Sequence, residues 1–161
     1  MPPHKVTPAH DPAGLATALG GVTFSKGAPQ VVDVGPHWVI AELDSVEAVE
    51  TLAPDLAALA AYDRAHHTTG ITLFAENGDG GITVRTFAPL DGIIEDPVCG
   101  SGNGALAAYR LHMGAVADGD RYLASQGRQV ARDGKVHIRI DGRDVHVGGD
   151  CVTCLDGMMR C

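Results

Sequence analysis

A glycine-rich segment that leads directly into a helix of small residues is the feature that most constrains the fold of this chain. The segment begins at Asp96 and passes through Gly100, Gly102 and Gly104, and the Ala and Leu spacing after it predicts a helix that ends near Gly114. The predicted helix is small on most of its faces. We therefore expect a sheet to wrap around it.

Short helices and strands are predicted along the rest of the chain. Asp11-Pro12 is typical of a helix start, Asp44 to Glu47 has the pattern of a capping box, and Pro54 precedes a third helix. Strands are predicted over residues 30–33, 38–43, 71–75, 82–87 and 136–140, and another begins at 145. The glycine-rich turn over 77–81 predicts a hairpin between two of them. Without an internal repeat or a linker, residues 1–161 are expected to form one mixed α+β domain with antiparallel hairpins.

The charge balance excludes several classes of function. The chain has 12 Lys and Arg against 20 Asp and Glu, a net charge of −8. An acidic surface repels nucleic acid and anionic membrane surfaces, so neither is an expected partner. The longest apolar runs are too short to span a membrane, and the N-terminal residues lack the apolar core of a signal peptide. We expect a cytoplasmic protein.

The start of the predicted central helix has the properties of an anion site. Glycines allow close approach of the backbone to a ligand, and the first turn of a helix offers unpaired N–H groups at the positive end of its dipole. A carboxylate or phosphate suits such a position. Gly100, Gly102 and Asn103 are therefore the candidate substrate-binding residues.

Three side chains next to this turn are the candidate catalytic residues. Asp96 lies five residues before Ser101, and Cys99 lies between them. A carboxylate, a thiol and a hydroxyl beside an anion site are suited to moving a proton on a carbon next to a substrate carboxylate. A helix N-terminus lowers a thiol pKa, which would favour Cys99 as a proton carrier. The alternative is structural: a tight turn, capped by Asp96, with Cys99 as a small buried residue.

The same segment resembles the signature of a known family. Residues 95–105, Glu-Asp-Pro-Val-Cys-Gly-Ser-Gly-Asn-Gly-Ala, are similar to the PhzF-like isomerases of phenazine biosynthesis. The surrounding sequence agrees at residues 34–38, 52–56, 85–89, 125–127 and 148–149, so the resemblance covers roughly residues 22 to 157.

The resemblance implies the diaminopimelate-epimerase-like fold. That fold has two similar halves, each a curved antiparallel sheet or partial barrel around a central helix, with the active site between them. Residues 102–113 correspond to the central helix of one half, and Asp96 and Ser101 fall on active-site positions. Cys99 falls where the epimerases and proline racemases of this fold place a proton-shuttling thiol, although the phenazine enzymes usually have another residue there.

Only the C-terminal half of the family is matched, so the resemblance implies one wall of a cleft. The general-base glutamate and the histidine motif of the other half have no counterpart here. We expect a cofactor-independent isomerase or epimerase that moves a proton on a small carboxylate-bearing metabolite. A second copy of the chain or a complementary N-terminal half would complete its site. The alternative is a non-catalytic carboxylate-binding or assembly module.

Other reactive side chains are given structural roles. Cys151 and Cys154 have the spacing of a metal knuckle and Cys161 adds a third sulfur, but zinc prefers four ligands, and the resemblance places a terminal strand here, so no metal is expected.

His66 and His67 are expected at the end of a helix. Arg85 either helps to hold a carboxylate or is a solvated surface residue. Glu95 and Asp96, being adjacent, are expected to diverge. His37 is expected to be a packing residue. The other histidines are expected to be exposed: His4, His10, His112, His137 and His146.

Overall fold

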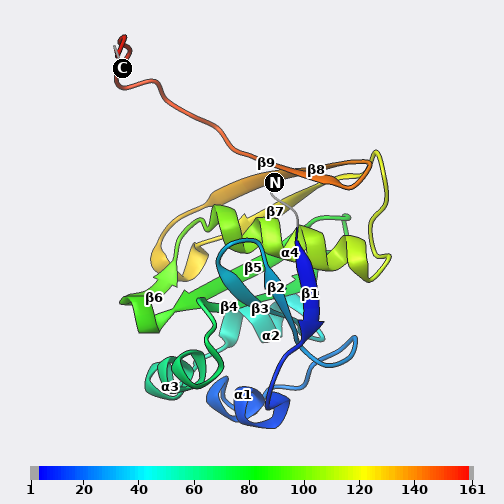
Figure 1. Cartoon of the computed structure of the whole chain (residues 1–161), viewed down its shortest axis with the longest axis vertical. Coiled ribbons are helices and arrows are strands. Elements are labelled where there is room, and N and C mark those ends of the chain that lie inside the picture. Colours follow the sequence, from blue (N-terminus) through cyan, green and yellow to red (C-terminus); the bar gives the residue numbers. More distant parts are fainter. Residues whose placement is uncertain (1–3, 160–161) are drawn as a thin grey trace.

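The computed structural model describes residues 4–159, and its main element is one strongly curved mixed sheet (Figure 1). The strands run in the spatial order β1-β2-β3-β4-β5-β7-β8-β9, and β6 pairs with β5 beside that path. Their bounds are β1 Lys5–Pro8, β2 Gln30–Asp33, β3 His37–Glu42, β4 Gly70–Glu76, β5 Ile82–Ala88, β6 Ile93–Asp96, β7 Arg121–Gln126, β8 Gly134–Asp141 and β9 Asp144–Gly148.

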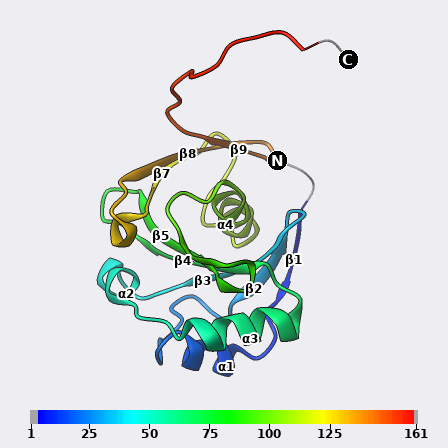
Figure 2. The same cartoon turned by 90° about the vertical axis from the view of Figure 1, so that its left-hand side faces the viewer.

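Helix α4 (Gly100–His112) lies inside the curve of this sheet, as Figure 2 shows end-on. Every residue from Gly102 to Arg110 is buried, so the helix is enclosed on nearly all of its faces. The alternating side chains Val136, Ile138 and Ile140 of β8 belong to the apolar cluster around it. The small side chains of α4 are therefore what allows the sheet to enclose it. The predicted α+β fold, with a curved sheet around a central helix, is confirmed.

Two of the strand pairs are parallel, which the expectation of an antiparallel sheet did not include. β3 pairs with β4 and β5 pairs with β7 in parallel register, while the other pairs are antiparallel. Parallel neighbours need a long crossover connection. The first crossover contains α2 (Val46–Thr51) and α3 (Leu56–His66), and the second contains the short 3-10 helix η1 (Pro89–Asp91), β6 and α4. The predicted hairpin of β4 and β5 is confirmed.

A second apolar layer covers the outer face of β3, β4 and β5. It is formed by α1 (Pro12–Ala18), α2 and α3, which lie on the side of the sheet opposite α4 in Figure 2. The helix start predicted at Asp11 is confirmed, since Asp11 Oδ1 accepts a hydrogen bond from Gly14 N at 3.0 Å. The capping box predicted from Asp44 to Glu47 is displaced by one residue: Ser45 caps α2, and its Oγ accepts from Ala48 N at 3.1 Å. α3 begins after Asp55, whose carboxylate caps it. His66 ends α3 and His67 follows it, as predicted.

The last described residues do not form the terminal strand that the resemblance placed there. Residues 149–159 have no regular secondary structure, and Figure 1 shows this segment leaving the sheet after β9. The register of β8 and β9 ends at the pair His137 and Gly148, and the residues after Gly148 do not continue the pairing, although β8 itself begins at Gly134. Cys151 and Cys154 are exposed and Cys161 lies outside the described residues. No group of three or more metal-ligating side chains occurs within residues 4–159. None of the helices described is long and apolar enough to cross a membrane.

Candidate functional site

Cys99 caps the N-terminus of α4 and does so with its sulfur. Its backbone is extended, and its Sγ accepts a hydrogen bond from Gly102 N at 3.3 Å. Asp96 caps the turn before the helix, as the structural alternative supposed. Its Oδ1 accepts from Val98 N at 2.9 Å, which closes a turn around Pro97 between β6 and α4.

The first two backbone amides of α4 are open to a ligand. Gly100 and Ser101 are exposed, and within the described chain neither of their N–H groups has an acceptor. A Cβ atom at Gly100 would meet nothing within 4 Å, so this position faces free space. The Ser101 hydroxyl lies beside them, accepting from Trp38 Nε1 at 3.2 Å and lying 3.7 Å from Cys99 Sγ. This arrangement has the donors that an anion requires at a helix N-terminus.

Gly102 and Asn103 face the interior, unlike the two residues before them. The Gly102 amide is already bonded to the Cys99 sulfur, so it has no free hydrogen for a substrate. Asn103 is 1% exposed, and its Nδ2 donates to Cys99 O at 2.9 Å and to Gln126 Oε1 at 2.7 Å. Its Oδ1 is buried and has no partner among the described residues. In this geometry both residues build the turn, and the amides available to a ligand belong to Gly100 and Ser101.

Gln126, at the end of β7, joins the parts of this site and was not predicted as a site residue. It is 1% exposed. Its Nε2 donates to Asp96 O at 2.7 Å, and its Oε1 accepts from Cys99 N at 3.3 Å and from Asn103 Nδ2. The available signal was a polar side chain at the end of a strand, followed by Gly127. A Cβ atom at Gly127 would lie 2.4 Å from Pro97 O, so a glycine there lets the two segments meet.

The expected lowering of the Cys99 pKa is wrong. Burial raises the pKa of this thiol above its usual value, and the nearby Asp96 carboxylate raises it further, against the hydrogen bonds from Gly102 and Ser101. The side chain is 4% exposed, so loss of hydration outweighs the helix N-terminus. Burial therefore disfavours the thiolate form of Cys99.

Arg85 holds a carboxylate of the protein itself. Its Nε and Nη2 donate to the two carboxylate oxygens of Glu95 at 3.0 and 2.7 Å, and both side chains are buried. Nη1 donates to the carbonyls of Val49 and Leu52 at 3.2 and 2.7 Å. Glu95 and Asp96 therefore diverge, as predicted: Glu95 fixes β6 to the body of the protein, and Asp96 turns towards α4.

Exposed apolar side chains precede and follow Asp96 in the chain. Ile93, Ile94 and Val98 are 43%, 66% and 47% exposed, whereas Asp96 is partly buried. Three surface hollows of about 410–420 Å³ lie elsewhere, and none is lined by Asp96, Cys99 or Ser101. The site is thus a surface turn next to an uncovered apolar patch.

A comparison with protein families shows which family this chain belongs to. A family model described as phenazine biosynthesis-like protein, PhzC-PhzF, matches residues 3–157. The chain belongs to this PhzC/PhzF family. The match extends the sequence resemblance, which began near residue 22, to almost the whole chain.

Two curated relatives of this PhzC/PhzF protein are named isomerases. An uncharacterized isomerase of Schizosaccharomyces pombe is 31% identical over 137 residues, which cover 80% of this chain and 74% of the relative. The trans-2,3-dihydro-3-hydroxyanthranilate isomerase of Pseudomonas chlororaphis is 31% identical over 144 residues, or 86% of this chain and 50% of the relative. Apart from the first of these, the chain spans about half the length of the curated relatives it matches.

The solved structures show the same fold. A structure described as a predicted epimerase from Pseudomonas aeruginosa aligns with a TM-score of 0.71 at 24% identity, covering 91% of this chain and 52% of that one. The PhzC/PhzF protein therefore has a diaminopimelate-epimerase-like fold, and the part described here corresponds to about half of that neighbour.

Proposed function

We propose that this chain contributes one wall of the active site of a cofactor-independent isomerase, which moves a proton on a carbon next to the carboxylate of a small metabolite. The observation that carries the proposal is the place of the partly buried Asp96 in the turn that leads directly into α4, whose first two amides, those of Gly100 and Ser101, are open. Relatives named isomerases support the same class of reaction.

The substrate carboxylate would be held at the start of α4. The amides of Gly100 and Ser101 and the Ser101 hydroxyl are the donors, and the positive end of the helix dipole adds to their attraction for an anion. Gly102 was also expected to donate its amide, but its bond to Cys99 Sγ assigns it to the turn. Gly102 and Asn103 therefore stabilise the turn that holds these donors in place.

Asp96 would exchange the proton. One of its oxygens is fixed by Val98 N, which orients the carboxylate and leaves the other oxygen for the reacting carbon. In the proposal Cys99 acts as a neutral proton donor, because its raised pKa disfavours the thiolate. Its more general contribution is to close the first turn of α4.

A second wall is needed to complete this site. The Asp96 turn faces solvent, and Ile93, Ile94 and Val98 beside it leave apolar surface uncovered. In the proposal a second copy of the chain, or a separate chain that corresponds to the N-terminal half of the family, covers this patch and supplies the second acid or base. Sedimentation that shows a stable monomer at micromolar concentration would count against the self-associated form.

Incorporation of deuterium from solvent tests the reaction. The assembled protein is incubated in D₂O with a panel of amino and hydroxy acids, and exchange at the carbon next to the carboxylate is followed by NMR. Asp96→Asn keeps the Val98 contact and should reduce the exchange rate at least about 100-fold. Asp91→Asn, which removes another exposed acid in η1, should leave the rate unchanged. Carboxylate binding without exchange would instead support a non-catalytic binding module.

A further inference from the structure

We propose that the outer face of β7, β8 and β9 carries a second anion site, which binds a small ligand with a phosphate or another multiply charged group. The site consists of Arg121, His137, Arg139 and His146, called here the basic face. It shares no residue with the site at the start of α4, and it does not depend on the isomerase proposal.

The strand register brings the basic side chains together. Arg121 of β7 lies directly opposite Arg139 of β8, and Arg139 lies opposite His146 of β9. Side chains that face each other across antiparallel strands have Cβ atoms about 5 Å apart, and like charges at such positions destabilise a sheet. An arrangement of this kind is compensated when an anion binds between the charges.

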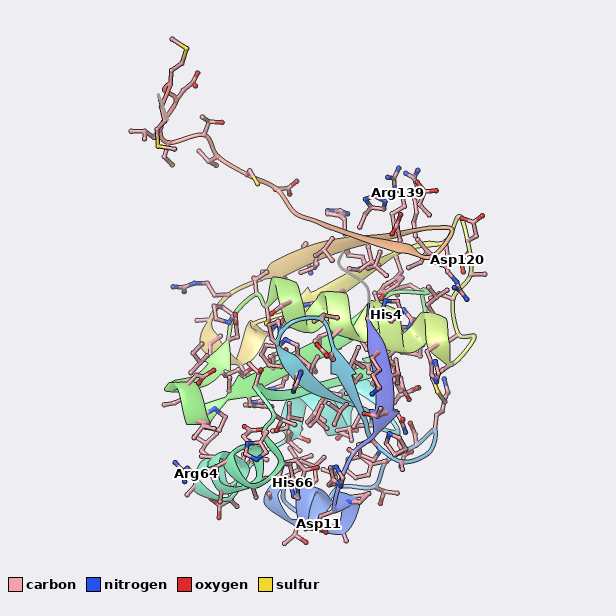
Figure 3. All side chains as sticks on the ribbon, viewed as in Figure 1. His4, Asp11, Arg64, His66, Asp120 and Arg139 are labelled. Carbon is pink, nitrogen blue, oxygen red and sulfur yellow. The ribbon has the colours of Figure 1, made fainter. Side chains whose placement is uncertain are left out.

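The basic face points away from α4. Ile138 and Ile140 of β8 are buried against the helix, so the alternating residues His137 and Arg139 point outward. Figures 1 and 2 place no helix on this side of β7–β9, and Arg139 projects from it in Figure 3, far from Asp11 and His66 at the opposite end of the molecule. Nothing in the described chain covers these residues.

A hollow of about 420 Å³ lies on this face. Its lining is Arg121, Tyr122, His137, Ile138, Arg139, His146, Val147 and Gly148, and it contains no acidic residue. The volume is in the range of sites for small ligands. In a protein of net charge −8, a hollow with two guanidinium groups, two imidazoles and no carboxylate is an unusual local concentration of donors.

The nearby acidic residues compensate only part of this charge. Asp141 Oδ2 lies 3.8 Å from Arg139 Nη2 and 3.9 Å from His146 Nε2, but it is outside the hollow and 66% exposed. Arg121 and His137 have no ion-pair partner within residues 4–159. Guanidinium groups bind phosphate oxygens through paired N–H donors. A phosphate-bearing small molecule therefore suits the charge and the N–H donors of this hollow.

Calorimetric titration of the intact chain with pyrophosphate, at about 0.1 M salt to screen distant charges, tests this inference. Saturable binding is expected, and Arg121→Gln and Arg139→Gln should each weaken it at least about tenfold. Arg143→Gln is the matched control, because it removes the same charge from the β8–β9 turn, outside the hollow. Its effect should stay below about twofold.

Three outcomes would overturn the proposal. One is the absence of saturation up to about 10 mM pyrophosphate, since specific sites of this kind bind more tightly. Another is an equal loss in all three variants, which would mean a general electrostatic attraction. The third is tighter binding of a polyglutamate peptide than of pyrophosphate, which would assign the face to an acidic protein partner.

Discussion

The side-chain amide of Gln126 donates a hydrogen bond of 2.7 Å to the backbone carbonyl of Asp96, thirty residues earlier in the chain. Through its other atom, Oε1, the same side chain accepts from Cys99 N and Asn103 Nδ2. One buried side chain at the end of β7 thus fixes the turn on which Asp96 and the open amides of α4 depend. That turn is therefore stabilised by contacts between residues far apart in the sequence.

Replacing this side chain should disturb the whole turn. Gln126→Leu removes the Gln126 partner of Asp96 O and Cys99 N and leaves Asn103 Nδ2 with only Cys99 O, and each buried polar group left alone costs about 1–3 kcal/mol. We expect the free energy of unfolding to fall by about 3 kcal/mol, measured by urea denaturation. Gln129→Leu is the control: it removes an exposed glutamine with one bond to Glu50 O, and should cost less than about 1 kcal/mol. Equal effects would contradict the bridging role.

Gly102 and Gly100 offer a direct comparison of two glycines in the first turn of α4. A Cβ atom at Gly102 would lie 2.8 Å from Thr72 Oγ1 and 3.0 Å from Cys99 Sγ, both on buried residues. Gly102→Ala should therefore lower the free energy of unfolding by about 1–3 kcal/mol. Gly100→Ala meets nothing within 4 Å and should change it by less than about 1 kcal/mol. Thermal unfolding of both variants measures the difference, and a greater loss at Gly100 would refute the packing argument.

The buried ion pair of Arg85 and Glu95 should respond strongly to the loss of one partner. Glu95→Gln leaves a buried guanidinium without its counter-charge, which costs about 3–5 kcal/mol. The exposed pair of Arg128 and Glu50 provides the contrast, since Glu50→Gln should cost less than about 1 kcal/mol. Chemical denaturation of the two variants tests this difference.

A double variant separates the charge from the packing. In Arg85→Met with Glu95→Leu no isolated charge remains, so we expect it to recover part of the stability lost in Glu95→Gln. If the double variant is less stable than Glu95→Gln, the hydrogen bonds of Arg85 to Val49 O and Leu52 O are the more important contribution.

Asp63 should make stability depend on pH. It is fully buried in α3, its Oδ1 accepts from Thr68 Oγ1 at 2.6 Å, and its Oδ2 has no partner among the described residues. Burial raises its pKa from 3.8 to about 6. Because the folded state then holds the proton more tightly than the unfolded state, stability falls as pH rises from about 4 to about 6, by roughly 3 kcal/mol at most.

Substitution by asparagine checks that sign. Asp63→Asn has no proton to lose, so the decrease between pH 4 and pH 6 should become smaller in urea denaturation curves recorded across that range. Asp44→Asn replaces an exposed carboxylate and should leave the pH profile as it is in the unmodified chain. A profile for Asp63→Asn that matches the unmodified protein would exclude Asp63 as the source.

The amino-acid sequence by itself determined several local elements of the fold. Asp11 and Ser45 cap their helices through atoms within three residues, and the hairpin of β4 and β5 follows from a short glycine-rich turn. The small side chains from Gly102 onward predicted an enclosed helix. These features rest on interactions between near neighbours, which a pattern of residues specifies directly.

The tertiary structure alone decided the chemistry around that helix. It paired Arg85 with Glu95, brought Gln126 to Asp96, placed two strand pairs in parallel and set Arg121 opposite Arg139. It also raised the pKa of Cys99, because burial by distant segments removed the water that would stabilise a thiolate. Burial and cross-strand register depend on contacts between residues far apart in the sequence. The spacing of residue types within one segment therefore does not predict them.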